Sequence, residues 1–437
     1  MSPQVNPVEV SETKTGIRRY IAAILSAIFM GLGQIFNGQI IKGIGFALFY
    51  FSALFQGYEF WKYSYWGITT LGEVPGEHHS LVILIKSLVG LILFLMVFGI
   101  YIFNIVDAYK NGKLRDQGKQ VPGIKKTFKN IVEHGYAFLY LSPGMIFLLL
   151  VTVLPLIFTT LIAFTNYDLY HSPPGKLLEW VGFTNFKKIW TFGSWKKTFL
   201  TVFSWTIVWT VLSTFSCFGL GLLVALVLNQ KDIKGAKIWR TILILPWAVP
   251  AVVSILIWSG LFNTNFGPIN ELLAFFNIER IHWLEDPFWA KVAVLIVNLW
   301  LGFPFSMALC TGILQGIPQD VYEAAVVDGA NPFQKFWKIT LPLVLYSTAP
   351  LLIMQMAYNF NNFNVIYLFN QGNPPILGLR GAGGTDILIS WVFKLTLNKL
   401  KYNYAAALSL IIFIIVAGFS IYNFTRTRSF KEEDMMQ

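Results

Sequence analysis

The chain has 437 residues, of which 55% are hydrophobic and 13% are charged. Soluble domains carry about 25% charged residues, so this composition excludes an ordinary water-soluble fold. The net charge of +11 could indicate a nucleic-acid-binding protein. However, the lysines and arginines cluster in links between apolar segments, where membrane proteins carry their topology signals. We therefore expect an integral membrane protein with no nucleic-acid partner.

The apolar residues fall in runs of about 20, the length that a helix needs to cross a hydrocarbon core. A transmembrane barrel would instead show segments of about 10 residues that alternate apolar with polar, and that pattern is absent. The predicted fold class is therefore an all-α integral membrane protein. The nine apolar segments are residues 20–35, 41–60, 81–106, 138–164, 201–228, 239–261, 289–314, 343–368 and 404–424.

The link 107–136 fixes the predicted orientation, because cytoplasmic links carry an excess of lysine and arginine. Its cations outnumber its three acids, and they are Lys110, Lys113, Arg115, Lys119, Lys125, Lys126 and Lys129. Alternate crossings then place the links 229–238 and 315–342 in the cytoplasm, together with the tail that holds Arg426 and Arg428. The links 165–200, 262–288 and 369–403 are predicted to be external.

The N-terminal segments fit this scheme only if one of them does not cross. Three crossings before Asp107 would leave Lys14, Arg18 and Arg19 outside. The first segment is the shortest and runs into a glycine-rich and amide-rich stretch, which suits a re-entrant or interfacial turn. That stretch holds Gly31, Gly33, Gln34, Asn37 and Gly38. We expect eight crossings.

The predicted organisation is an N-terminal membrane extension with a basic linker, 1–137, followed by a six-helix core, 138–430. The sequence has no GxxxxGK[ST] phosphate loop, and its five histidines lie in links without helical ligand spacing. We therefore expect no catalytic residue and no metal site. Energy for any transport must come from a gradient or from a separate ATPase.

The cytoplasmic link 316–342 predicts two short helices. Pro318 suits a first helical position, Gly329 a C-terminal stop, Asn331 with Pro332 a new N-cap and first turn, and Pro342 the end of the second helix. Ala324 and Ala325 leave a smooth face, and three aromatic residues repeat at helical spacing. Such a pair predicts docking into a groove of another subunit. The alternative is an amphipathic loop on the membrane surface. The aromatic residues are Phe333, Phe336 and Trp337.

The same link resembles the EAA signature of permease subunits of type I ABC importers, with EAAxxDGA followed by IxLP. The resemblance implies a coupling helix that seats in an ATPase subunit, formed by Glu323, Ala324, Ala325, Asp328 and Gly329. It further implies a heterodimer with a second permease, two ATPase subunits that use ATP and Mg, an extracellular solute-binding protein, and a place in the bacterial cell membrane. This chain would then be no enzyme and would bind no cofactor.

Residues 142–167, 242–263, 297–305 and 358–363 are similar to the larger permease subunit of maltose and maltodextrin importers. The similarity covers roughly residue 138 to the C-terminus. Gram-negative members of this family carry a large folded domain in the first external loop, whereas the link 165–200 here has about 36 residues. The front 130 residues or so also exceed the family's short N-terminal hairpin.

A polar stripe in the segment 343–368 is the candidate sugar site. Gln355, Tyr358, Asn359 and Asn362 lie at i, i+3, i+4 and i+7, one face of a helix. Carboxamides in hydrocarbon are costly unless they are paired or line a cavity, and amides with an aromatic ring suit a neutral, hydroxyl-rich ligand. The alternative is hydrogen bonding between helices. These two explanations remain open on the residues alone.

Gly302 and Pro304 interrupt the segment 289–314 and predict a kink, which serves either a cavity or packing alone. The resemblance favours the cavity in both cases. It implies that the sugar site is lined by Leu301, Gly302, Phe305, Gln355, Tyr358, Asn359 and Asn362. Phe305 replaces a tyrosine and Gln355 a serine of that pattern, so the sugar can be maltose, a longer maltodextrin or another oligosaccharide.

Two other classes of function compete with an ABC permease. A gradient-driven secondary sugar transporter normally needs ionisable residues at mid-membrane, and the core segments hold none. A membrane-embedded enzyme needs convergent acids, bases or a metal, and no such cluster is present. The predicted function is the transmembrane subunit of a maltodextrin-type importer, with the secondary transporter as the alternative.

Overall fold

The structure is a computed structural model that describes residues 16–123, 129, 132–133, 135–230 and 232–426. Lys14, Lys125, Lys126 and Arg428 of the predicted charge pattern lie outside these residues. The chain forms two compact units. Unit 1 holds the described residues within 1–161 and 170–180, and unit 2 holds 162–169 and the described residues from 181 onward. The functional boundary between 137 and 138 stays a prediction.

The described residues are helical apart from links and one isolated β-bridge, which confirms the predicted fold class. Seven helical stretches are long and apolar enough to cross a membrane, and a bent pair, Ala236–Ala248 with Ala251–Leu261, makes an eighth if it counts as one crossing. Eight crossings is the predicted number. The seven are Ile40–Thr70, Ser80–Asp116, Tyr140–Ile162, Gly193–Leu228, Pro287–Gly316, Pro332–Asn370 and Tyr402–Asn423.

Unit 1 is built on a long helix pair, α3 (Ile40–Thr70) and α4 (Ser80–Asp116). Two small residues of each helix meet at the contact and let the backbones approach closely. A Cβ atom on Gly67 would lie 2.3 Å from Ser87 Oγ, and one on Gly90 would lie 1.9 Å from Ser64 Oγ. The remaining elements of unit 1 are α1 (Arg18–Ile28), α2 (Leu32–Phe36), α6 (Tyr136–Leu148), the π-helical turn η1 (Leu149–Val153) and α7 (Leu154–Ile162).

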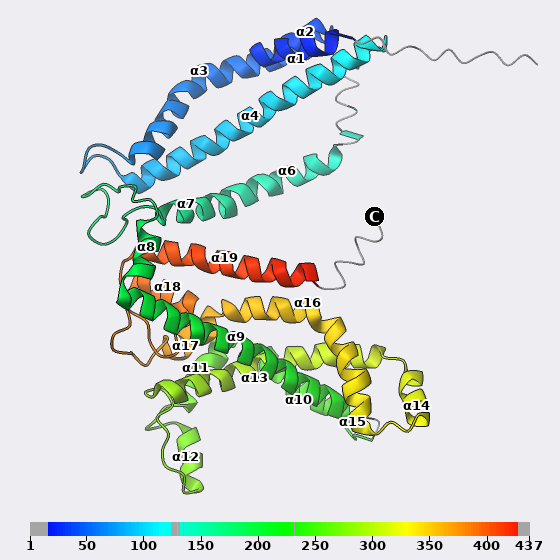
Figure 1. The fold of residues 1–437 in the computed structure, drawn as a ribbon, viewed down its shortest axis with the longest axis vertical. Coiled ribbons are helices and arrows are strands. Elements are labelled where there is room, and N and C mark those ends of the chain that lie inside the picture. Colours follow the sequence, from blue (N-terminus) through cyan, green and yellow to red (C-terminus); the bar gives the residue numbers. More distant parts are fainter. Residues whose placement is uncertain (1–15, 124–128, 130–131, 134, 231, 427–437) are drawn as a thin grey trace, which may run out of the picture. The chain divides into compact units, whose positions relative to one another are not determined.

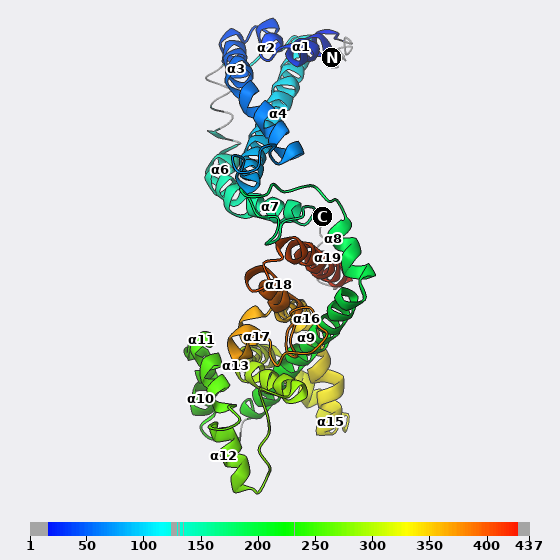
Figure 2. The ribbon, with the colours of Figure 1, turned by 90° about the vertical axis from the view of Figure 1, so that its left-hand side faces the viewer.

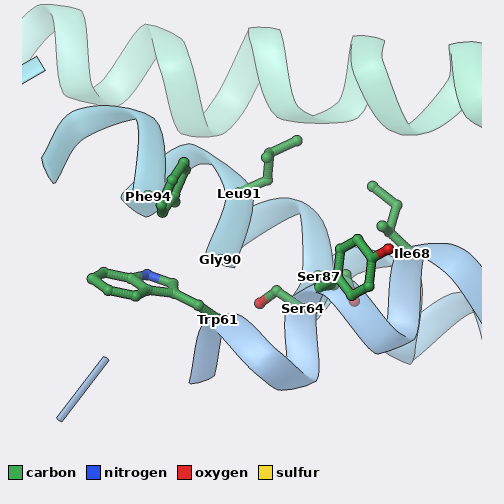
Figure 3. A pocket seen from close by; sticks show the side chains of 8 residues that line it. Trp61, Ser64, Ile68, Ser87, Gly90, Leu91 and Phe94 are labelled. Atoms are coloured by element: carbon green, nitrogen blue, oxygen red, sulfur yellow. The ribbon is translucent and has the colours of Figure 1, made fainter. Parts of the chain in front are cut away.

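An apolar cavity of about 280 Å³ adjoins this contact between α3 and α4. Figure 3 shows Trp61 and Phe94 at one end and the two serines, Ser64 and Ser87, beside the ribbon. The Trp61 and Phe94 rings meet edge to face with centroids 5.6 Å apart. Apolar surface of this kind faces either lipid or another apolar segment.

The first predicted segment forms a short helical hairpin, α1 and α2, which packs against the last turns of α4 (Figure 1). With 11 residues, α1 is about 16 Å long, too short to cross a bilayer. Gly31 makes the turn between the two helices with φ +93°, a conformation that favours glycine. The expected failure of the first segment to cross is confirmed.

A buried polar network holds this hairpin to α4. The Asn104 side-chain oxygen accepts from the Gly31 N–H at 3.2 Å, and Gln34 Nε2 donates to the Asn104 carbonyl at 2.9 Å and to Asp107 Oδ2 at 3.0 Å. Lys42 Nζ lies 2.7 Å from Asp107 Oδ1. The amides of the glycine-rich stretch are therefore explained by pairing within unit 1.

Unit 2 is organised around α9 (Gly193–Leu228) and α13 (Pro287–Gly316), which pack along each other. The broken pair α10 (Ala236–Ala248) and α11 (Ala251–Leu261) packs on α13 (Figure 2). The other elements are α8 (Thr184–Thr191), α12 (Pro268–Phe275), α14 (Gln319–Val327), α15 (Pro332–Lys335), η2 (Phe336–Thr340), α16 (Leu341–Phe360), α17 (Phe363–Asn370), α18 (Leu388–Leu397) and α19 (Tyr402–Arg426).

Two buried clusters lie among the described residues of unit 2. The larger one is rich in tryptophan and phenylalanine and joins α9, α11, α13 and α17. The smaller one lies between α9, α13 and α16. Within the unit, α14 and α15 lie at the opposite end from α8 and α18 (Figure 1), so the ends predicted to be cytoplasmic and external are separated by the length of the crossing helices.

Candidate functional site

A cavity of about 570 Å³ lies inside unit 2, between the α10–α11 break, α13, α16 and the start of α17. All seven residues that the sequence analysis selected line it: Leu301, Gly302, Phe305, Gln355, Tyr358, Asn359 and Asn362. No Asp, Glu, Lys, Arg or His is among the described residues that line it. The cavity therefore offers amides, aromatic rings and backbone groups, which suit a neutral polar solute.

The helix that carries the polar stripe is broken within the stripe. The α16 helix ends at Phe360, and Asn362 begins α17, its side-chain oxygen accepting from the Val365 N–H at 3.4 Å. The expectation of one helical face through Asn362 is therefore wrong at this residue. Asparagine side chains compete with the helical backbone by capping, and residue 361 is another asparagine. The break still turns Asn362 into the same cavity.

Two of the stripe's amides are also bonded across helices. Asn359 Nδ2 donates to Thr214 Oγ1 of α9 at 2.9 Å, and Asn362 Nδ2 donates to Asn298 Oδ1 of α13 at 3.3 Å. The indole of Trp209 donates to the Asn359 carbonyl at 2.9 Å. Asn359 and Asn362 are buried, at 1% and 5% exposure. The amide N–H groups of both asparagines therefore serve hydrogen bonding between helices, although both residues also line the cavity.

Tyr358 and Gln355 differ from these two asparagines. The Tyr358 side chain is 61% exposed, and the Gln355 amide has no hydrogen-bond partner among the described residues. Their polar groups remain available to a solute. The polar stripe therefore divides into a bonded pair, Asn359 and Asn362, and an available pair, Gln355 and Tyr358, whose polar groups can bind a solute.

On α13, Gly302 allows α9 to pack closely against this helix. A Cβ atom there would lie 2.7 Å from Cys217 Sγ of α9. The helix runs as one element from Pro287 to Gly316 with Pro304 inside it, and the predicted kink stays a prediction. Gly302 thus contributes to packing as well as to the cavity wall.

The sequence analysis missed the wall formed by the α10–α11 break. The two helices meet at 92°, with Val249 in an extended conformation between them. Pro246 and Pro250, four residues apart, are the sequence signal for this break, since each removes a backbone donor and restricts the preceding residue. Trp247 at the break packs on Phe305 with ring centroids 5.8 Å apart. The other missed wall residues include Asn298 and Asn364.

The two helices predicted in the link 316–342 are present, with one correction. The α14 helix starts at Gln319, one residue after Pro318, and Gly329 ends it with φ +75°. Asn331 caps α15 in a capping box with Gln334. Pro342, however, does not close the second helix, because α15, η2 and α16 continue as one crossing, Pro332–Asn370. The π-helical turn η2 before Pro342 widens the helix and accommodates its missing N–H.

The predicted coupling residues lie on α14 and just after it. Glu323, Ala324, Asp328 and Gly329 are exposed, whereas Ala325 is buried. Tyr322 Oη lies 2.9 Å from Thr340 Oγ1 and ties α14 to η2. Exposed apolar side chains surround these residues and leave a face open for a partner. They are Val326, Val327, Phe333 and Trp337.

A bundle of helices long and apolar enough to cross a membrane, with an uncharged polar cavity and a protruding pair of short helices, defines the membrane-embedded subunit of a transporter. Residues 218–428 match the family of the binding-protein-dependent transport system inner membrane component. A relative from Bacillus subtilis (strain 168), the galactooligosaccharides transport system permease protein GanP, is 44% identical over 94% of this chain and 98% of its own length. The chain belongs to this family of permeases of binding-protein-dependent transport systems.

Further comparisons extend this assignment. The maltodextrin transport system permease protein MdxF of Bacillus subtilis (strain 168) is 42% identical over 94% of this chain and 97% of its own length. A bacterial ABC transporter involved in alginate import has the same fold, with a TM-score of 0.58, 23% identity and coverage of 69% of this chain and 98% of its own. The resemblance to ABC permeases is confirmed, as is a place in the bacterial cell membrane.

The comparisons correct the extent of the resemblance. The motifs that carry the resemblance begin only at about residue 138, whereas GanP and MdxF align over 94% of the chain. The N-terminal extension is therefore shared with these relatives. Membership of this permease family, shared with GanP and MdxF, sets aside the alternative of a gradient-driven secondary transporter.

Proposed function

We propose that the chain forms half of the translocation pathway for a neutral oligosaccharide of the maltodextrin or galactooligosaccharide type. The observation that carries this proposal is the uncharged polar cavity of unit 2. Its available groups, on Tyr358 and Gln355, suit a sugar, because an aromatic ring lies against the apolar face of a pyranose and an amide both donates and accepts. Permeases for both sugar types, MdxF and GanP, support the same class.

The remaining subunits supply what this chain lacks. A second permease completes the pathway, two ATPase subunits bind ATP and Mg²⁺, and an extracellular solute-binding protein delivers the sugar. Glu323, Ala324, Ala325, Asp328 and Gly329 couple the chain to one ATPase. Closure of the ATPases moves α14, and the covalent continuity of α15, η2 and α16 carries that movement toward the polar stripe.

Uptake of labelled oligosaccharides into vesicles that contain the purified complex tests this function. We expect maltodextrins or galactooligosaccharides to enter only with ATP and the binding protein. Replacement of Tyr358 by alanine should raise the sugar concentration for half-maximal uptake about tenfold, the size expected for an aromatic anchor. Leu200 of α9, exposed away from the cavity, is the matched control. Uptake without any ATPase would contradict the importer assignment.

A further inference from the structure

The α1–α2 hairpin lies along the charged end of α4 in unit 1. Near the start of α1, a Cβ atom on Gly112 of α4 would lie 2.6 Å from the Arg19 Cα atom. At the other end of α1, the Tyr101 hydroxyl of α4 donates to the Ala27 carbonyl. Since the apolar run of α4 ends near residue 106, α1 passes from the level of polar residues to the level of apolar ones. One end of the hairpin therefore lies at the depth of lipid headgroups and the other at the depth of acyl chains.

The outer face of α1 is apolar over its whole length. Its side chains recur at helical spacing on the side opposite to Ala22 and Ser26, which are buried. Ile24 and Ile28, toward the apolar end, are 59% and 69% exposed. Hydrocarbon is the environment that matches such a face, as in helices that lie at a membrane interface. The face consists of Ile17, Tyr20, Ile21, Ile24 and Ile28.

Two guanidinium groups meet at the turn that follows α2. Arg18 Nη2 donates to the Phe36 carbonyl at 3.2 Å, and its guanidinium lies over the Phe36 ring, 5.0 Å from the ring centroid. Arg115 Nε donates to the Asn37 carbonyl at 3.1 Å. Gly38 leaves room for this second arginine, because a Cβ atom there would lie 2.7 Å from Arg115 Nη2. The two groups are therefore held close to each other, since they bond to consecutive carbonyls.

Most donors of both arginines remain available for a ligand. A guanidinium has five N–H donors, and each of these two uses one of them on a carbonyl. Among the described residues, no carboxylate forms a salt bridge with Arg18 or Arg115. The acids at this end of the unit are engaged elsewhere, Asp107 by Lys42 and Asp116 by a backbone N–H of α1. Topology requires an excess of cations at a cytoplasmic end, but it does not require two guanidinium groups at one turn, so an anionic ligand is the better explanation.

We propose that Arg18 and Arg115 bind the phosphate headgroup of an anionic membrane lipid, whose acyl chains lie along the outer face of α1. Planar guanidinium groups match phosphate oxygens with paired N–H donors. The site lies on the side predicted to be cytoplasmic, where anionic lipids gather. Arg18 and Ile21 are neighbours on α1 at i and i+3, so the headgroup site adjoins the apolar face, which leads toward Ile28 at the depth of acyl chains. A free phosphate would leave this face uncovered, which favours a lipid.

The turn that carries this site is fixed before the lipid binds. Asn37 Nδ2 donates to the Ala108 carbonyl of α4 at 2.9 Å, and Gln34 Nε2 donates to the Asn104 carbonyl at 2.9 Å. A fixed turn lowers the entropy that is lost on binding. The bound lipid thereby fastens the N-terminal extension to the bilayer, and this role is independent of the transported sugar.

Titration of the purified full-length chain with dioleoylphosphatidylglycerol, followed by native mass spectrometry, measures this binding. We expect Arg18→Gln with Arg115→Gln to raise the Kd of the first bound lipid at least about tenfold, because charge-assisted hydrogen bonds are lost. Lys110→Gln with Lys113→Gln is the matched control. It removes two charges from the side of α4 opposite to Arg115 and should change the Kd by no more than about threefold, because salt screens distant charges.

Arg18→Lys with Arg115→Lys keeps both charges and with them the topology signal. This pair should still raise the Kd about threefold or more, because the guanidinium forks are lost, and it carries the test if the glutamine pair does not fold. A Kd within about twofold of wild type for either pair would overturn the inference. So would binding of dioleoylphosphatidylcholine as tight as that of the phosphatidylglycerol. Equally tight binding of glycerol 3-phosphate would replace the lipid by a free phosphate.

The outer face of α1 has a separate test. Ile24→Asn with Ile28→Asn should raise the Kd of dioleoylphosphatidylglycerol about tenfold, because apolar area covered by the acyl chains is lost. The Kd of dihexanoylphosphatidylglycerol, whose short chains end before this part of the face, should stay within about twofold of its wild-type value. An equal change for both lipids would contradict the proposed path of the acyl chains.

Discussion

Both units of this protein bury carboxamides inside membrane helices, but only one of them leaves such groups available. In unit 1, Gln34 donates to the Asn104 carbonyl and to Asp107, the Asn104 side chain accepts from Gly31, and neither amide lines the cavity beside Ser64 and Ser87. In unit 2, Asn359 and Asn362 are bonded across helices, while their neighbours Gln355 and Tyr358 face a cavity. A polar stripe in a membrane helix therefore does not distinguish a structural network from a binding site. The space beside it does.

The largest expected effect concerns the exposed end of unit 2. Glu323→Ala should lower ATP-coupled uptake by about a hundredfold or more, because the exposed carboxylate of α14 is the proposed contact with the ATPase. The protein should still insert and co-purify with the second permease. Uptake and subunit recovery from the same membranes measure both. Asp320→Ala, on the same short helix, is the control. Normal uptake by Glu323→Ala would remove the coupling role.

In unit 1 the expected effect is on stability instead. Asp107→Ala leaves Lys42, whose side chain is only 14% exposed, without its partner. Loss of one member of a largely buried pair costs about 3 kcal/mol. Denaturant titration of the purified protein measures this loss. Uptake per inserted molecule should change little, and a selective loss of uptake would give unit 1 a direct part in transport.

Substitution of the hydrogen-bonded asparagines of unit 2 should reduce both stability and uptake. Asn359→Ala removes the hydrogen bond to Thr214 and should cost about 1 kcal/mol of stability. Since the residue also lines the cavity, uptake should fall more than recovery of the assembled complex does. Thr214→Ala is the matched variant, because it removes the same bond from outside the cavity. Equal effects of both variants on uptake would make Asn359 a structural residue alone.

The smallest effect is expected at the available pair. Tyr358→Phe keeps the ring and removes the hydroxyl, so half-maximal uptake should need about threefold to tenfold more sugar, the worth of one hydrogen bond of about 1 kcal/mol. The free energy of unfolding should not change, since the side chain is 61% exposed. A drop in stability without a change in uptake would place Tyr358 with the structural network.

Several features followed from the sequence because local physics decides them. Runs of about 20 apolar residues predict crossings, Gly329 and Asn331 mark the stop and start of the two short helices, and the cations that precede the first segment argue against its crossing. The failures lie where neighbouring elements decide. Pro342 follows a π-helical turn that accommodates it, and Asn362 caps a new helix instead of extending the old one.

The sequence by itself determined that this protein is helical, membrane-embedded and equipped with a pair of short helices in the link 316–342, because composition and periodicity reflect the solvent that each segment faces. Only the tertiary structure decided which polar side chains form hydrogen bonds to neighbouring helices and which face a cavity. A hydrogen bond such as Asn359 to Thr214 joins residues 145 positions apart. A local sequence pattern cannot predict that partner, because the packing of the helices determines which side chains meet.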